Sequence, residues 1–112
     1  MGRGQAAAPW RIRLRQAGFR PAAILDIQAA YLWYEEQQPG LGEEFLAAID
    51  VAIESVLAFP EAYTIVHRDA RRILLERFPY GLYYRIAGQQ VIFVACMHGA
   101  RDPKEWRSRL KG

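Results

Sequence analysis

Apolar residues recur at helical spacing in two neighbouring segments of the chain. The first segment follows Pro21, a residue suited to the first turn of a helix. Its apolar stripe consists of Ile24, Ile27, Tyr31 and Tyr34, with Ala23 and Ala30 beside them. The second carries Phe45, Ile49, Ala52, Ile53 and Val56 along one side and ends near Pro60. These intervals of three and four residues predict helices over about 21–38 and 43–58. The helix-breaking proline and glycines at 39–42 end the first helix. Because they leave only a short connection between the two helices, we expect an antiparallel helical hairpin.

Alternation with a period of two marks the strands. Ile12 and Leu14 alternate with arginines over 11–15, which predicts a first strand with one apolar face. Apolar and β-branched residues predict three more strands, at 72–78, 82–86 and 91–96, separated by a bend at 79–81 and a turn at 88–90. Strands joined this tightly form an antiparallel meander.

The predicted order is therefore strand, helix, helix and three strands. This order predicts an α+β fold, β-α-α-β-β-β, with the helical hairpin packed on a mainly antiparallel four-stranded sheet. The 112 residues are enough for one domain, which we place at 11–112 after a flexible tail at 1–10. The segment after His98 is predicted to be a short helix or a basic arm.

A second apolar stripe lies on the other side of the first predicted helix. On a helical wheel, Leu25, Ala29 and Leu32 fall roughly opposite the core stripe, with Trp33 at the edge. Apolar residues on both sides of a surface helix indicate a docking surface. The simpler alternative is a few scattered exposed apolar side chains, which are common in soluble proteins.

Charge is distributed in blocks along the chain. Residues 1–20 contain five arginines and no acid, residues 21–62 contain eight acids and no lysine or arginine, and residues 63–112 contain ten basic and four acidic residues. Such blocks predict two faces of opposite sign with different partners.

The sequence lacks the signals of several classes of protein. The single cysteine, Cys96, excludes an internal disulfide, and its apolar strand predicts an inert thiol. The longest apolar run, 91–97, is far shorter than the roughly 20 residues that span a bilayer, and we expect no signal peptide, no membrane association and a cytoplasmic location. No nucleotide-binding glycine loop, metal-ligand cluster or nucleophile elbow occurs, so we expect no cofactor and no metal.

Three stretches together resemble the RelE/ParE toxin superfamily, and in particular its ParE-like, plasmid-stabilisation branch. They are the helical hairpin over 30–46, the run 71–85 with its Phe78-Pro79-Tyr80 and Tyr83-Tyr84-Arg85, and His98 followed by Arg101, Trp106 and Arg109. The resemblance implies the toxin of a type II toxin–antitoxin system, neutralised by a cognate antitoxin with which it forms a hetero-oligomer. ParE-type members inhibit DNA gyrase and thereby growth, whereas RelE-type members cleave messenger RNA on the ribosome without a metal. A third hypothesis is a non-toxic nucleic-acid-binding or orphan module.

The candidate catalytic residues distinguish only partly between a ribonuclease and a protein that acts by binding. RNA cleavage needs a base, cations that stabilise the phosphorane and an acid, for which the candidates are Arg77, His98 and Arg101. Trp106 can stack on a base but cannot transfer a proton, so the nuclease constellation is incomplete and whether the protein is an enzyme stays open.

Two surfaces follow as predictions. The target-binding surface is predicted to contain Arg72, Arg77, His98, Arg101, Trp106 and Arg109. The antitoxin-binding surface is predicted to contain Leu25, Leu32, Trp33, Arg71 and Arg85. We expect His67 to lie in a loop. Tyr83 and Tyr84 should point to opposite faces of their strand, one in the core and one lining a basic groove.

Overall fold

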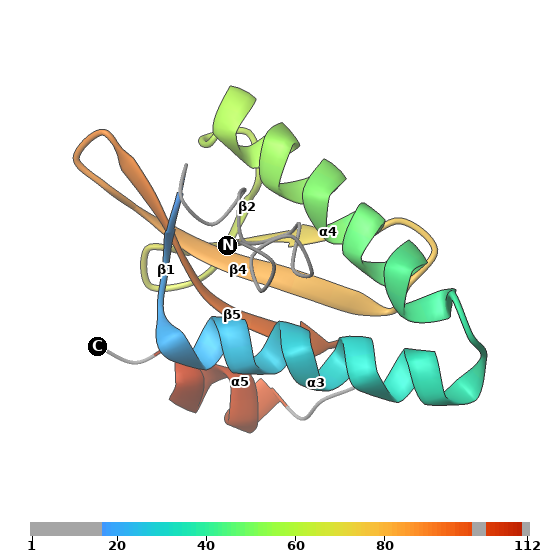
Figure 1. Ribbon diagram of the computed structural model, residues 1–112. Coiled ribbons are helices and arrows are strands. Elements are labelled where there is room, and N and C mark those ends of the chain that lie inside the picture. The colour runs from blue at the N-terminus through green and yellow to red at the C-terminus, as the bar shows by residue number, and fades with distance from the viewer. Residues whose placement is uncertain (1–16, 100–102, 111–112) are drawn as a thin grey trace, which may run out of the picture.

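Two long helices cover one face of a five-stranded sheet, and a short helix lies by the other face (Figure 1). The computed structural model describes residues 17–99 and 103–110. In chain order the elements are β1 (Gly18–Phe19), α3 (Pro21–Gln37), α4 (Leu41–Ala58), β2 (Thr64–His67), β3 (Ala70–Leu74), β4 (Tyr80–Ala87), β5 (Gln90–His98) and α5 (Pro103–Arg109). The predicted α+β class and the helical hairpin are confirmed.

The helices bury the faces that their apolar spacing indicates, with one adjustment. In α4, the predicted core residues Phe45, Ile49, Ile53 and Val56 are at most 1% exposed. In α3, Ile27 and Tyr34 are buried as predicted, together with the neighbouring Ala23 and Ala30, whereas Ile24 and Tyr31 are only half-buried. Small alanines on the inner face allow α3 to lie close to β5, so the buried face is centred slightly to the alanine side of the predicted stripe.

The sheet has the order β1-β5-β4-β3-β2. The meander β2–β3–β4–β5 is antiparallel throughout, and the short β1 pairs in parallel with β5, placing Gly18 opposite Ile92. A register shift between Tyr83 and Tyr84 interrupts the β4–β5 ladder.

The strand predictions need three corrections. Among the described residues the sheet has five strands rather than four, and two of them, Gly18–Phe19 and the edge strand Thr64–His67, were not predicted. His67 therefore belongs to a strand and not to a loop. The third strand covers 70–74 rather than 72–78, because it pairs with β2 across the tight turn at 68–69. Tyr80 and Gly81, predicted as part of a bend, begin β4. The predicted strand at 11–15 and the tail at 1–10 lie outside the described residues.

The core has two parts, one on each face of the sheet. The larger lies between the helical hairpin and the sheet, and the smaller contains Ala70, Tyr83, Val94, Ala95, Met97 and Leu110. Tyr84 belongs to the first part and Tyr83 to the second, so the prediction of opposite faces is confirmed. The prediction that one of them lines an open groove is wrong, because both are at most 1% exposed.

Candidate functional site

The apolar stripe on the outer side of α3 is exposed over its whole length. Leu25, Leu32 and Trp33 retain 63%, 58% and 54% of their accessible surface. The opposite side of the helix packs on the sheet, so the helix is apolar on two sides. An isolated exposed leucine is ordinary, but a stripe of this length on one helix is typical of a surface that binds a partner.

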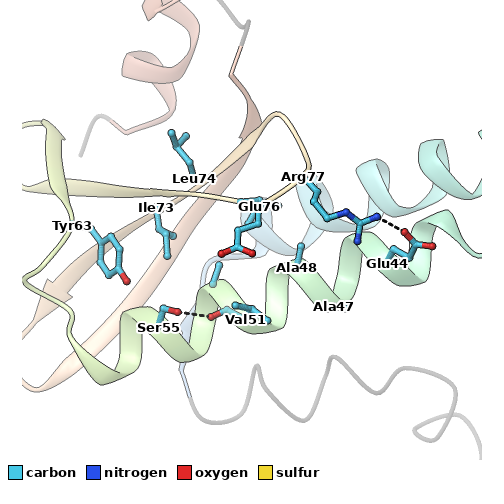
Figure 2. Close-up of a pocket in the computed structure, with 12 residues that line it drawn as sticks. Glu44, Ala47, Ala48, Val51, Ser55, Tyr63, Ile73, Leu74, Glu76 and Arg77 are labelled. Carbon is cyan, nitrogen blue, oxygen red and sulfur yellow. Dashed lines mark hydrogen bonds and ion pairs between the residues drawn. The ribbon is translucent and has the colours of Figure 1, made fainter.

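A groove of about 400 Å³ runs between α4 and the strand β3 with its following loop (Figure 2). Ala47, Ala48 and Val51 line it from the helix, while Ile73 and Tyr63 point toward the helix from the sheet side. At one end, the guanidinium of Arg77 donates a hydrogen bond to the carboxylate of Glu44 at 2.6 Å. The groove is thus apolar along its floor and carries an ion pair at its end.

Arg77 adopts an unusual backbone conformation in the loop that closes this groove. Its φ of 71° lies in the left-handed region, which costs a non-glycine residue about 1–3 kcal/mol and recurs at functional sites. The side chain is 67% exposed despite its ion pair. Arg77 is therefore accessible to a partner, as the prediction of its role requires.

The other residues predicted to bind the target do not share one surface. Arg72 pairs in register with Tyr83 and its side chain lies against Gly81, so it occupies the sheet face opposite the helical hairpin. His98 ends β5, and its ring packs edge-on against Tyr80 with centroids 5.3 Å apart. Arg101 and the side chain of Trp106 lie outside the described part of the chain.

Arg109 forms part of the fold itself. Its two terminal nitrogens donate to Asp26 of α3 at 2.7 and 3.3 Å, and the same carboxylate accepts a hydrogen bond from the backbone N–H of Cys96 at 2.9 Å. Asp26 thus joins α3, β5 and α5. Sequence reasoning did not single out Asp26, although an acidic residue between Leu25 and Ile27 in an apolar segment is a signal that can be found.

The two arginines predicted to meet the antitoxin also make internal contacts. Arg71 donates to the backbone carbonyls of Tyr63 at 2.8 Å and Glu61 at 3.1 Å, which holds the connection between α4 and β2. Arg85 donates to Asp69 at 2.7 Å and to the carbonyl of Leu110. Their guanidinium groups therefore position neighbouring loops.

The chemistry available to the described residues is limited. Burial and, to a lesser extent, the charge of Asp26 raise the pKa of the Cys96 thiol far above its usual value, so this thiol is protonated and unreactive. Within residues 17–99 and 103–110, no three His, Cys, Asp or Glu side chains gather in a way that suits a metal ion. None of the helices in this part of the chain is long and apolar enough to cross a bilayer.

Comparison with known families decides what kind of protein has this arrangement. The family described as the ParE toxin of type II toxin–antitoxin systems, parDE, matches residues 18–103. The chain belongs to the ParE toxin family. The match extends from β1 to the start of α5, and it confirms the ParE-like resemblance of the sequence.

A solved structure supports the same fold for this ParE toxin family member. The structure, titled "Chromosomal ParDE TA system from P. aeruginosa", has a TM-score of 0.62 and 19% sequence identity, and the similarity covers 74% of this chain and 96% of that one. Identity this low shows a shared fold alone. No sequence matches in the comparison with curated proteins.

Proposed function

We propose that this chain is a cytoplasmic toxin that inhibits growth by binding DNA gyrase, and that a cognate antitoxin neutralises it. The observation that carries the proposal is the exposed apolar stripe of α3 in a chain whose residues 18–103 match the ParE toxin family. A small protein with such a stripe needs a partner to cover it, and a toxin–antitoxin pair supplies one.

The antitoxin is proposed to lay an amphipathic helix along Leu25, Leu32 and Trp33. Helices commonly bind partners through apolar side chains at spacings of three and four residues, and the stripe has these spacings. The solved structure with the similar fold is titled as a ParDE toxin–antitoxin system, in keeping with a toxin–antitoxin pair. Arg71 and Arg85 would then contribute to antitoxin binding only indirectly, because their hydrogen bonds to Tyr63 and Asp69 hold the neighbouring loops in position.

The contacts that the candidate catalytic residues make within the fold favour target binding over RNA cleavage. Arg77 is paired with Glu44 on α4, whereas the ring of His98 packs on Tyr80 in the sheet. A nuclease would need an acid and a base arranged around its cations. Arg77, with its exposed guanidinium, remains the residue that we propose for target contact, because Arg72 lies on the opposite face of the sheet and the ring of His98 packs on Tyr80.

The antitoxin arm of the proposal is tested by a double change, Leu25→Glu and Leu32→Glu, in the full chain. Burying one leucine contributes about 1.5–3 kcal/mol and each 1.4 kcal/mol is tenfold in affinity, so we expect at least a ~100-fold loss in antitoxin affinity by calorimetry. Phe59→Glu is the control, since Phe59 is 69% exposed at the end of α4, on another element. Equal affinity of the double variant and the wild type would contradict the proposed surface.

The target arm is tested by induced expression without antitoxin, with DNA and protein synthesis followed separately. We expect DNA synthesis to stop first, and the purified chain to inhibit supercoiling by gyrase. His98→Gln should retain most of the toxicity, because binding energy is spread over several contacts. A fall of roughly 10²–10⁴ in activity on loss of His98, with cut messenger RNA, would instead identify a ribonuclease.

A further inference from the structure

A basic hollow lies between the β2–β3 turn and α5, away from the surfaces assigned so far. Its volume is about 330 Å³, and it is lined by His67, Arg68, Lys104, Arg107 and Ser108. The described side chains that line it are all polar, and three of them carry a permanent positive charge. None of the five belongs to the predicted target-binding or antitoxin-binding surface.

The two walls of the hollow are held in place by Arg85. This side chain donates one hydrogen bond to Asp69, the neighbour of Arg68, and another to the carbonyl of Leu110 directly after α5. Ala70 and Leu110 are both fully buried in the same part of the core. The cations of the turn and those of α5 therefore share a fixed framework, which reduces the cost of ordering them around a ligand.

Positive charge exceeds negative charge at this place. Among the described residues of the β2–β3 turn and α5, the acidic ones are Asp69 and Glu105, against the basic Arg68, Lys104 and Arg107 and the neighbouring Arg85. The hydrogen bond from Arg85 lowers the pKa of Asp69, so this carboxylate stays ionised and remains committed to Arg85. Lys104 and Arg107 are three residues apart on one helix, a spacing that brings side chains together on a common face.

We propose that this hollow binds the phosphodiester backbone of a nucleic acid. Phosphate recognition relies on lysine, arginine and hydroxyl groups, all of which line the hollow. A protein partner would need apolar or aromatic anchors at the centre of its interface, and none is among the described side chains that line the hollow. The inference is independent of gyrase and antitoxin binding, which we place on α3 and on the loop that carries Arg77.

The test measures binding of the purified full chain to fluorescent 20-nucleotide probes, a DNA duplex and a single-stranded RNA, at several salt concentrations. Arg68→Asn and Arg107→Gln each remove one charge of the hollow, and asparagine suits the φ of 55° at position 68. Arg20→Gln is the matched control, because Arg20 is exposed at the start of α3 and has the same charge. Circular dichroism checks that each variant folds, and Lys104→Gln replaces Arg68→Asn if the turn does not tolerate the change.

Each change in the hollow should lower the slope of log affinity against log salt by about 0.9 for the duplex or about 0.7 for the single strand. It should also weaken binding about threefold or more at low salt, while Arg20→Gln leaves the slope unchanged. The tighter of the two probes identifies the kind of backbone. The proposal is overturned if neither probe binds, or if Arg20→Gln weakens binding as much as the changes in the hollow. Equal or tighter binding of a polyglutamate peptide, with the same dependence on Arg68 and Arg107, would assign the hollow to an acidic protein instead.

Discussion

Asp26 shows how one side chain can join distant parts of the chain. Its carboxylate accepts hydrogen bonds from the backbone of Cys96 and from the guanidinium of Arg109, which are 70 and 83 positions away. The Asp26 side chain is largely but not fully removed from solvent. A buried polar group costs about 1–3 kcal/mol when it is left without a partner, so these bonds offset most of the cost of placing a carboxylate between α3 and β5. The same carboxylate raises the pKa of the adjacent Cys96 thiol, in addition to the larger effect of burial.

The raised pKa of Cys96 predicts a dependence of stability on pH. The folded chain keeps the thiol protonated at a pH where the unfolded chain, with an ordinary thiol pKa of about 8.5, already ionises it. The stabilising contribution is therefore complete below that pH and is lost as pH rises above it. We expect the free energy of unfolding to fall by up to about 1.4 kcal/mol per pH unit, measured by urea titrations between pH 7.5 and 9.5.

Cys96→Ala isolates this contribution from that of Tyr31, Tyr34 and Tyr84, whose pKa values are also raised by burial. The variant should be less stable at every pH because it leaves a small cavity, but its stability should fall less steeply in this range. A variant with the same pH profile as the wild type would show that Cys96 does not titrate on unfolding.

The α3–α4 hairpin depends on a turn that the side chain of Glu35 completes. Its two carboxylate oxygens accept hydrogen bonds from the backbone N–H groups of Gly40 and Gly42, each at 3.0 Å. At the N-terminal end of a helix these N–H groups have no carbonyl acceptor within the helix itself, so the carboxylate takes that place. Its negative charge also interacts favourably with the N-terminal end of the helix dipole. Gly40 has a φ of 91°, a conformation that favours glycine. The turn thus sets the angle at which the two helices meet.

Gly42→Ala tests how closely the hairpin is packed. Alanine normally stabilises a helical position by up to about 1 kcal/mol over glycine, but a Cβ at position 42 would come within 2.8 Å of the ring of Tyr31 and the carboxylate of Glu35. We therefore expect the substitution to destabilise the fold by about 1–3 kcal/mol, measured by thermal or urea unfolding.

Gly99→Ala provides the control for this substitution. A Cβ at position 99 would meet only the carbonyl of Pro79, at an ordinary contact distance of 3.5 Å, so its effect should be within about 0.5 kcal/mol. A stabilised Gly42→Ala variant would mean that α3 and α4 can move apart without cost.

On the side of the sheet away from the hairpin, the C-terminal segment completes the fold. Leu110 is fully buried beside Tyr83 and Met97, and Arg109 bonds Asp26 across the edge of the molecule. Removing the chain after residue 101 would therefore expose part of the core as well as delete basic residues. Loss of toxicity in such a truncated chain could not be assigned to target binding, which is why single substitutions are the better test.

Leu110→Ala measures how much this second part of the core contributes. A buried leucine changed to alanine costs about 2–5 kcal/mol, and we expect a loss in that range by urea unfolding. Leu74→Ala makes the same chemical change at a leucine that is 61% exposed and should alter stability by no more than about 0.5 kcal/mol. Equal stability of the two variants would mean that α5 is held by its polar contacts alone.

Periodic patterns in the sequence by themselves determine the helices and the meander. Regular spacing of apolar residues reports which side of an element is buried, and this is why the core of α4 and the exposure of Leu25, Leu32 and Trp33 could be predicted. The edge strand β2 was missed, because four residues are too few to show a period and two of them, Thr64 and Ile65, are exposed. The β3 boundary was misplaced, because the pairing with β2 sets where that strand begins.

Which charged residues hold the fold together and which remain exposed could be read only from the tertiary structure. Nothing in the spacing of Asp26 and Arg109, or of Arg85 and Leu110, indicates that they meet, since each contact joins segments far apart in sequence. The same holds for the basic hollow, whose walls are brought together by the packing of α5 against the sheet. Local sequence thus determined which faces are apolar, and chain folding decided which arginines support the structure and which remain exposed to partners, because a long polar side chain takes its partner from whatever the fold places within reach.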